Sequence, residues 1–407
     1  MRFPEYVRKI LSALQSEGFA AYAVGGCVRD SLLGLVPHDW DITTSARPED
    51  VLRVFDRPPF ATRAEGGLRH GTVTVLYKGE TCDACEVTTF RTEGTYSDHR
   101  RPDRVEFVGD PAEDLARRDF TVNAMAAAPD LRPDGTEKLL FLDPFGGEAD
   151  LKAGILRCVG EPERRFEEDA LRILRGIRFA ARYGFAVEEA TGRAMHACAP
   201  LLDCIAPERI GAELRGILAC DHWAETLALF PDILDRLLPE ASPAAETDIW
   251  QVQNTTVRLA LLCRRCNTDM LREKLLRFSF GKEEADRVIR LLQHRDSPVS
   301  THRDLCFLAD VFGRDGIEEL LNFRTCIKPN EFPEKDTRDR MERIFAPGVC
   351  YSVSTLAVNG RDLILSGAAK PGPELGALLL QLRDLVIDGR LPNEKAALLR
   401  AAHSYMK

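Results

Sequence analysis

Two acidic residues spaced two apart carry the strongest chemical signal in the chain. Asp39 and Asp41 lie in the segment PHDWDIT. On an extended strand, side chains at i and i+2 point to the same face, so these carboxylates are expected to lie side by side. Such a pair can hold Mg²⁺ ions that bridge nucleotide phosphates and an attacking hydroxyl. The alternative is a solvated acidic turn, and the neighbouring motifs decide between the two interpretations.

A glycine pair lies upstream of the acidic pair. Gly25 and Gly26 follow a strand-like run and precede a helical segment that contains Arg29. Glycines let the backbone approach a phosphate closely, and an arginine guanidinium matches phosphate oxygens. A glycine pair alone equally indicates a tight structural turn. Its position just before the acidic pair favours a phosphate site. Glu86, on a later alternating run, is either a third metal-directed carboxylate or an exposed strand residue.

Two arginine-rich segments complete the candidate site. In LARRDFTVNAM, Arg118 can reach the outer phosphates of a bound triphosphate. Further along, Asp169 precedes Arg172, Arg175 and Arg178, which recur every three residues on an expected helix. A charged stripe is usually a solvated helix face. Three arginines without a lysine, preceded by an aspartate, favour planar hydrogen-bond recognition instead.

The elements that must position these residues change character along the chain. The first 130 residues contain short alternating runs at 20–24, 71–77 and 85–90, with helices expected at 5–15 and 50–55. From about residue 161, helical periodicity dominates. Together these patterns predict a mixed α/β N-terminal part followed by a helical remainder.

Composition limits the function classes. The 407 residues carry a net charge of −9, which argues against a uniformly basic nucleic-acid coat. Residues 258–303 nevertheless contain 11 Lys and Arg against 6 acidic residues. The sequence shows no apolar run of about 18 residues and no signal-peptide pattern, so we expect a cytoplasmic protein without a membrane span.

Cysteine usage fits the same compartment. The chain has 12 Cys, including two CxxC pairs, Cys82 with Cys85 and Cys263 with Cys266. These pairs could together supply four zinc thiolates. Because they lie far apart in the sequence, free thiols are the favoured interpretation.

The motifs in their order resemble those of bacterial tRNA nucleotidyltransferases, the CCA-adding and poly(A) polymerase family of the polymerase β superfamily. The matching segments are VGGCVRD, DWDITT, HGTVTV, EVTTFR, RRDFTVNA and EDALR, with VNGRDL near the C-terminus. The resemblance implies an α+β fold, with a polymerase-β-like nucleotidyltransferase head of mixed sheet and helices and then an all-α neck, body and tail. The implied parts are a catalytic head at 1–135, a nucleotide-selecting neck at 136–205, and a tRNA-binding body and tail at 206–345 and 346–407.

The resemblance also assigns roles to residues. It implies catalytic, Mg²⁺-binding carboxylates at Asp39 and Asp41, with Glu86 as a further catalytic candidate. The implied nucleotide contacts are Gly25, Gly26, Arg29, Arg118, Asp169, Arg172, Arg175 and Arg178. The implied partners are tRNA, CTP and ATP, with no obligate protein partner.

Base selection by two of these residues follows from hydrogen-bond chemistry. Cytosine and adenine both present an amino donor beside a ring-nitrogen acceptor. Asp169 can only accept a hydrogen bond and Arg172 can only donate one, so the pair matches both bases. Uracil and guanine present a carbonyl and a ring N–H, and each mismatch leaves a buried polar group unpaired, at a cost of roughly 1–3 kcal/mol. The alternative is a mutual surface ion pair between Asp169 and Arg172.

Several activities remain open within and outside this family. Related CC-adding enzymes lack a flexible loop before the RRDF motif, whereas residues 92–102 fill that place here. The loop favours full CCA addition, with A-addition alone as the alternative. Poly(A) polymerases normally carry basic C-terminal extensions, and this sequence ends in Ala- and Leu-rich segments. A non-catalytic tRNA-binding module is disfavoured because Asp39 and Asp41 are both present.

Overall fold

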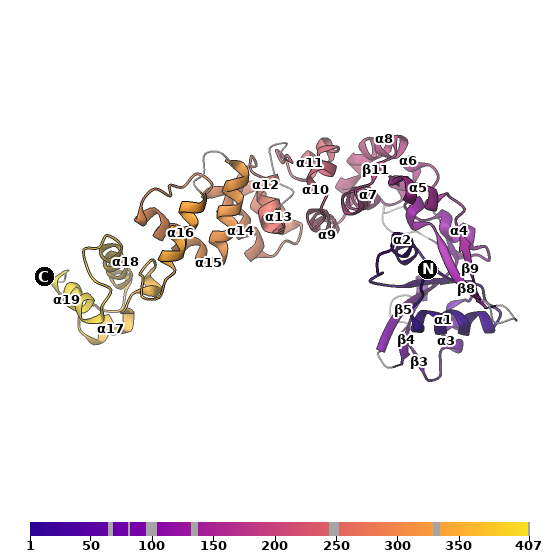
Figure 1. The fold of residues 1–407 in the computed structure, drawn as a ribbon, viewed down its shortest axis with the longest axis horizontal. Coiled ribbons are helices and arrows are strands. Elements are labelled where there is room, and N and C mark those ends of the chain that lie inside the picture. Colours follow the sequence, from indigo (N-terminus) through magenta and orange to yellow (C-terminus); the bar gives the residue numbers. More distant parts are fainter. Residues whose placement is uncertain are drawn as a thin grey trace. The chain divides into compact units, whose positions relative to one another are not determined.

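The computed structural model divides the chain into two compact units, Met1–Leu237 and Leu238–Lys407 (Figure 1). The structure describes residues 1–63, 68–79, 82–94, 104–131, 137–243, 252–328 and 334–405. Within these ranges, no helix is long and apolar enough to cross a lipid bilayer.

A seven-stranded mixed sheet forms the N-terminal part of the first unit (Figure 1). Its strand order is β3-β4-β5-β2-β1-β8-β9, and its neighbours run antiparallel except for the parallel pair β2 and β5. The strands are β1 (Ala21–Val24), β2 (Asp41–Thr44), β3 (Phe60–Arg63), β4 (Thr72–Lys78), β5 (Cys82–Thr89), β8 (Ala126–Leu131) and β9 (Glu137–Leu142). Two small sheets pair β6 (Arg91–Glu93) with β7 (Val105–Phe107) and β10 (Ile155–Leu156) with β11 (Ala186–Val187). The strands expected at 20–24, 71–77 and 85–90 are confirmed.

Short helices accompany this sheet. They are α1 (Glu5–Ser16), α2 (Gly26–Leu32), α3 (Pro48–Val54), α4 (Pro111–Ala116) and the 3-10 helix η2 (Thr121–Asn123). Helix α1 buries Val7, Ile10, Leu11 and Leu14, an i, i+3, i+4, i+7 stripe that turns one apolar face inward. It packs against β1 and α3. The helices expected at 5–15 and 50–55 are therefore present.

A run of helices completes the first unit. It comprises α5 (Gly147–Ala153), α6 (Pro162–Glu168), α7 (Leu171–Tyr183), α8 (Glu189–Cys198), α9 (Pro207–Leu218), α10 (Trp223–Ala228) and α11 (Pro231–Leu237). Helix α7 is central, because it packs against α9, α10 and α6. The expected change to helical structure near residue 161 is confirmed. The division of the chain into four parts stays a prediction; helices α9 to α11 belong to the first unit.

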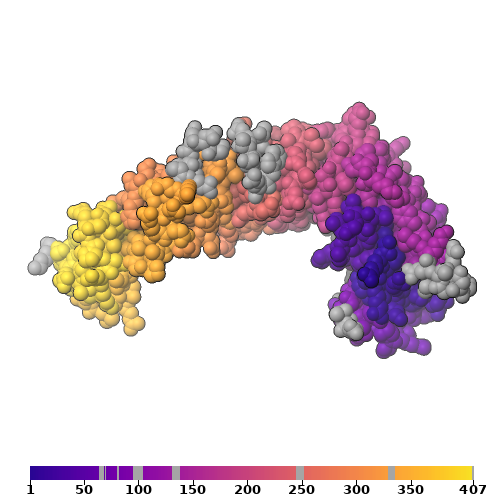
Figure 2. Space-filling view, in the orientation of Figure 1, coloured from indigo at the N-terminus to yellow at the C-terminus, as the bar shows by residue number. Residues whose placement is uncertain are grey.

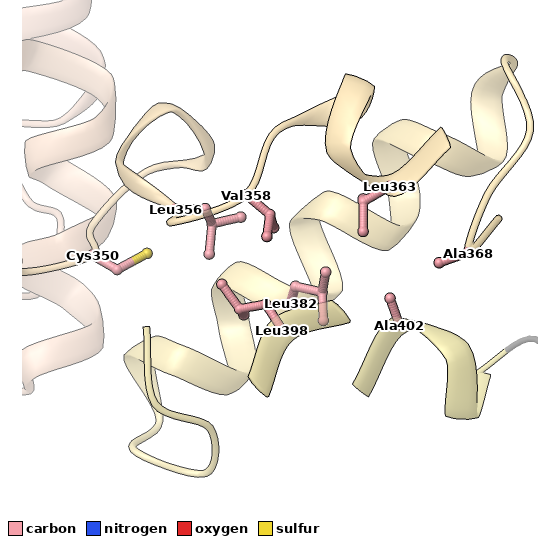
Figure 3. Packing of buried hydrophobic residues seen from close by; sticks show 8 residues of the cluster. All are labelled: Cys350, Leu356, Val358, Leu363, Ala368, Leu382, Leu398 and Ala402. Carbon is pink, nitrogen blue, oxygen red and sulfur yellow. The ribbon is translucent and has the colours of Figure 1, made fainter. Parts of the chain in front are cut away.

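The second unit is helical in the ranges described. Its helices are α12 (Thr255–Leu262), α13 (Thr268–Arg277), α14 (Lys282–Gln293), α15 (His302–Ile327), α16 (Glu334–Ile344), α17 (Gly360–Leu365), α18 (Pro373–Ile387) and α19 (Lys395–Tyr405). The last three surround an apolar cluster that includes Leu363, Leu382 and Leu398, each fully buried (Figure 3). These C-terminal helices form the yellow part of the space-filling view (Figure 2). They continue the helical structure expected from about residue 161 onward.

The cysteine pairs take different local structures. Cys82 is exposed and Cys85 is buried on the same strand, β5, because residues three apart on a strand face opposite sides. The Cys85 thiol donates to the Trp40 carbonyl at 2.9 Å. The two thiols of the first pair therefore point to opposite faces of the sheet.

Candidate active site

Asp41 and Glu86 lie opposite each other on two neighbouring parallel strands. Asp41 is the first residue of β2, and the strand register pairs it with Glu86 of β5. Both residues are exposed, whereas the next pair in the register, Ile42 and Val87, is buried. Because side chains alternate along a strand, both carboxylates emerge on the solvent side of the sheet. The structure thus brings Glu86 to the acidic pair.

The segment before β2 has the alternation that the sequence predicted. The side chain of Asp39 is 83% exposed, and its Oδ2 lies 2.9 Å from Nδ1 of His38. Trp40 turns the other way, is buried, and packs against the Phe3 ring at a centroid distance of 5.6 Å. Asp39 and Asp41 therefore share the solvent side while Trp40 anchors the segment to the core.

This arrangement concentrates negative charge. Although the Asp41 side chain reaches the solvent, the surrounding protein displaces part of its water, and this desolvation raises its pKa. The carboxylate of Glu86 raises the pKa further, and Asp39 adds a smaller effect in the same direction. The guanidinium of Arg118 opposes them. Carboxylate oxygens are the ligands that Mg²⁺ prefers, and a divalent cation would relieve this repulsion. No three His, Cys, Asp or Glu side chains in the described ranges form a metal-binding group, so the fit rests on donor chemistry and charge.

A glycine turn and the half-buried Arg118 lie beside the carboxylates. Gly25 precedes α2 with φ +80° and ψ −129°, a conformation that favours glycine. A Cβ atom at Gly25 would lie 2.8 Å from Nη1 of Arg118, so the guanidinium rests directly against the turn. Desolvation lowers the pKa of Arg118, and its Nε has no hydrogen-bond partner within the described residues. A half-buried cation against a backbone turn, with Gly26 next in the chain, suits a phosphate.

Arg29 differs from the sequence prediction of an open phosphate contact. Its side chain is buried, and Nε donates to Oδ1 of Asp30 at 2.9 Å. It also donates to Oδ1 of Asn123, and its guanidinium carbon lies 4.7 Å from the ring centroid of Tyr183. These contacts hold the guanidinium between α2, η2 and α7.

Asp169 and Arg172 take separate partners. Asp169 has an extended conformation (φ −143°, ψ 101°) that ends α6, and its Oδ1 accepts from the Leu171 amide at 3.1 Å. This local side-chain bond competes with helical hydrogen bonding, so Asp169 lies between α6 and α7 and not on the helix that carries Arg172. Oδ2 of Asp169 accepts from Arg209 at 3.0 Å. Nη1 of Arg172 donates to Glu168 at 2.6 Å, and Nη2 donates to the Arg117 carbonyl at 3.2 Å.

Arg175 and Arg178 of α7 also have acidic partners. Arg175 donates through Nε to Oδ2 of Asp119 at 2.9 Å, and Nε of Arg178 lies 2.9 Å from Oε2 of Glu213. Burial alone would raise the pKa of Asp119, but Arg175 and a hydrogen bond from Asn123 outweigh it and lower the pKa to about 2. Asp119 is therefore a firmly ionised anchor for the helix.

Asp119 and Asn123 are structural residues of the site to which the sequence interpretation assigned no role. Both are buried polar residues of the RRDFTVNA segment. The signal was present, since a polar side chain on an apolar face needs a partner. Their partners lie on α2 and α7, which are distant in the sequence.

Comparison with known proteins supports a single family across nearly the whole chain. The family model described as Poly A polymerase head domain matches residues 21–157, and the one described as tRNA nucleotidyltransferase domain 2 matches residues 250–402. A CCA-adding enzyme of Levilactobacillus brevis is 36% identical over 98% of this chain and 97% of its own. One of Lacticaseibacillus paracasei is 36% identical over 97% of this chain and 94% of its own.

A solved structure agrees with these relatives. The crystal structure of the Bacillus stearothermophilus CCA-adding enzyme in complex with CTP covers 100% of this chain and 98% of its own, at 31% identity and a TM-score of 0.76. The shared fold comprises the nucleotidyltransferase head and the helical remainder that the motifs predicted. The chain therefore belongs to the CCA-adding enzyme family, the tRNA nucleotidyltransferases.

Proposed function

We propose that the chain adds C, C and A in turn to the 3′ end of tRNA, using CTP and ATP. The observation that carries the proposal is the pairing of Asp41 with Glu86 beside a glycine turn that packs against the half-buried Arg118. That arrangement suits a metal-assisted phosphate reaction, and the family supplies the tRNA end as the acceptor. Because tRNA is matured in the cytoplasm, we propose that location as well.

The reaction is nucleotidyl transfer. The 3′ hydroxyl of the tRNA attacks the α-phosphate of the nucleotide, a new phosphodiester forms, and pyrophosphate leaves. Asp39 and Asp41, with Glu86 beside them, would hold Mg²⁺, which when bound supplies charge neutralisation at the reacting phosphate. Arg118 holds the outer phosphates over the Gly25 turn. These roles extend the donor chemistry described above to the expected substrate.

Base selection is assigned to Asp169 and Arg172. Asp169 accepts from the amino group of cytosine or adenine, and Arg172 donates to the adjacent ring nitrogen. Both are held by neighbours, Asp169 by Arg209 and Arg172 by Glu168. Binding of the correct base would exchange those neighbours for the base, whereas a wrong base would leave the groups unpaired.

The second unit is proposed to contact the tRNA backbone. The basic segment 258–303 is less available than its charge suggests, because Arg258 is fully buried and Arg287 pairs with Glu319. Arg303 bonds to Asp384 and Asp388, each at 2.9 Å. Exposed residues of the segment, such as Arg265, Arg277 and Lys282, are the better candidates for phosphate contacts, which should weaken with added salt.

A-addition alone is the nearest alternative activity, and poly(A) synthesis is a second. The loop that favours full CCA addition is expected at 92–102, and its residues 95–102 lie outside the described residues. An assay that supplies each nucleotide separately therefore distinguishes these three activities. A non-catalytic tRNA-binding module is tested in the same experiment, since it would add nothing.

The test replaces each carboxylate in turn. Asp39→Asn and Asp41→Asn should each reduce incorporation of CTP by at least about 10²-fold, because metal-assisted charge stabilisation supplies several kcal/mol. Asp56→Asn is the matched control, since Asp56 is an exposed acid of the same unit that lies near Arg57. Both site variants should keep the wild-type melting temperature. Wild-type turnover in both would refute the assignment.

A further inference from the structure

Helix α7 begins just after Asp169 and carries Arg172, and Tyr183 at its C-terminal end ties it to the segment that follows the Gly25 turn. We propose that Tyr183, at the C-terminal end of α7, is a positioning residue that fixes the distance between base recognition and the phosphate site. The inference rests on the proposed function for its catalytic consequence. Its structural part stands on contacts within the first unit alone.

The tyrosine makes two contacts with the segment that follows Gly25. Its hydroxyl donates to Oδ1 of Asp30 at 2.8 Å, and its ring lies under the guanidinium of Arg29 at 4.7 Å. Arg29 binds the same Asp30 oxygen, with Nη2 at 2.7 Å. Both Arg29 and Asp30 are buried, so the tyrosine hydroxyl shares a carboxylate that solvent hardly reaches.

These contacts continue into a network of side-chain hydrogen bonds. Arg29 donates to Oδ1 of Asn123, and Nδ2 of Asn123 donates to Oδ1 of Asp119 at 3.1 Å. Asp119 in turn accepts from Arg175 at 2.9 Å. This side-chain network therefore begins and ends on the same helix, at Tyr183 and at Arg175, and it passes through α2 and η2 between these two points.

The two ends of the side-chain network lie on one face of α7. Arg175, Phe179 and Tyr183 are spaced at i, i+4 and i+8, which places them in one row. Phe179 lies between them, with its ring 5.2 Å from the Arg29 guanidinium and 5.4 Å from that of Arg175. Eight residues of helix span about 12 Å, so the head holds α7 at two well-separated points.

Two anchors fix both the position and the tilt of a helix, whereas one anchor leaves a pivot. Without the Tyr183 hydroxyl, α7 remains attached at Arg175 and can tilt about it. A tilt of about 5° about Arg175 moves the Tyr183 end of α7, about 12 Å away, by roughly 1 Å, and moves Arg172, about 4.5 Å away on the other side, by roughly 0.4 Å. A misplacement of about 1 Å can lower turnover by as much as 10²-fold, so this smaller displacement is expected to lower it by about tenfold.

The expected kinetic effect is specific. The substitution Tyr183→Phe keeps the aromatic ring and removes only the hydroxyl group. The base contacts and the phosphate contacts each survive, so KM for CTP and ATP should change by less than about twofold. The alignment of the bound base with its phosphates becomes less exact, so kcat should fall about tenfold for CTP and for ATP. The preference for CTP over UTP should narrow, because a looser helix rejects a misfit less strictly.

The experiment compares Tyr183→Phe with Tyr77→Phe. Tyr77 lies on β4 in the same unit and is not part of the side-chain network. Steady-state kinetics with tRNA lacking its 3′ end and each of the four nucleotides gives kcat, KM and the CTP-to-UTP ratio. Hydrogen exchange measured by mass spectrometry reports on the anchor without using activity. Tyr183→Phe should speed exchange in α2 and in the second half of α7, and Tyr77→Phe should change neither measurement.

The outcomes separate this inference from the proposed function. Faster exchange with lower kcat and little change in KM supports the positioning role. Unchanged exchange in α2 and α7 overturns it, whatever the kinetics. Faster exchange with wild-type kcat and nucleotide ratio also overturns it, because the hydroxyl would then be merely structural. A wild-type protein that adds no nucleotide refutes the proposed function, while the exchange result still decides whether the anchor exists.

Discussion

Replacing Gly25 with alanine should separate backbone strain from loss of the phosphate-binding arginine. An alanine at φ +80° costs roughly 1–3 kcal/mol of folding free energy. Its Cβ atom would also lie 2.8 Å from Nη1 of Arg118, which is closer than van der Waals contact allows. Because that atom is the far end of a flexible side chain, Arg118 can move away with little further loss of stability. The guanidinium then leaves the place where it would meet the phosphates.

The matched control is Gly34→Ala. Gly34 has a similar φ of +75°, but nothing lies within 4 Å of its Cβ position. Both variants should melt a few degrees below the wild type, since about 1 kcal/mol shifts the melting temperature by roughly 2–4 °C in a unit of this size. Only Gly25→Ala should lose catalytic efficiency. A displaced charged hydrogen bond is worth about 1.5–3 kcal/mol, which predicts a drop of roughly 10- to 100-fold in kcat/KM for CTP and ATP alike.

The assay is incorporation of labelled CTP into tRNA that lacks its 3′ end, with thermal unfolding measured on the same preparations. Wild-type kcat/KM in Gly25→Ala would show that Arg118 does not hold the phosphates. An equal loss of activity in both glycine variants would attribute the effect to backbone strain and would also contradict the reasoning.

Three further predictions concern charged groups of the site. Glu86→Gln should raise the Mg²⁺ concentration needed for half-maximal activity several-fold, because it removes one of the carboxylates around Asp41; an unchanged Mg²⁺ titration would make Glu86 a bystander. Asp169→Ala should lose the preference for CTP over UTP, and an unchanged ratio of kcat/KM values would move base selection elsewhere. Asp119 has a folded pKa of about 2 against an ordinary value of 3.8, so its stabilisation is present above pH 4 and is lost as the pH falls toward 2. Urea unfolding should show that wild type loses about 2 kcal/mol more than Asp119→Asn between pH 5 and pH 2, and parallel curves would refute the linkage.

The residues predicted best from the sequence are those whose geometry is local. The spacing of Asp39 and Asp41 fixes a common face on any extended segment, and the structure shows that alternation around Trp40. The glycine turn likewise follows from residues that are adjacent in the chain. The pairing of Glu86 with Asp41 depends on strand order, which no local pattern in the sequence determines.

Long-range partners explain what the sequence did not predict. Arg29 has the type and place of a phosphate contact, yet its partner Asn123 lies 94 residues further along. Tyr183, which binds the adjacent Asp30, lies 153 residues beyond it. No local periodicity encodes such contacts, because they depend on how α7 packs against the sheet domain. The break at Asp169 was also unexpected, since a helix-like spacing conceals a residue whose side chain bonds to the backbone two positions on.

The central claim is most directly tested by supplying nucleotides one at a time to the purified protein with tRNA that lacks its last three residues. With CTP alone, the product should grow by two nucleotides and stop. With CTP and ATP together, it should grow by three and stop, and UTP or GTP should add nothing. Extension by ATP only on tRNA that already ends in CC would indicate an A-adding enzyme, and a long run of A would indicate a poly(A) polymerase. Either result, or the absence of any extension, would contradict the account.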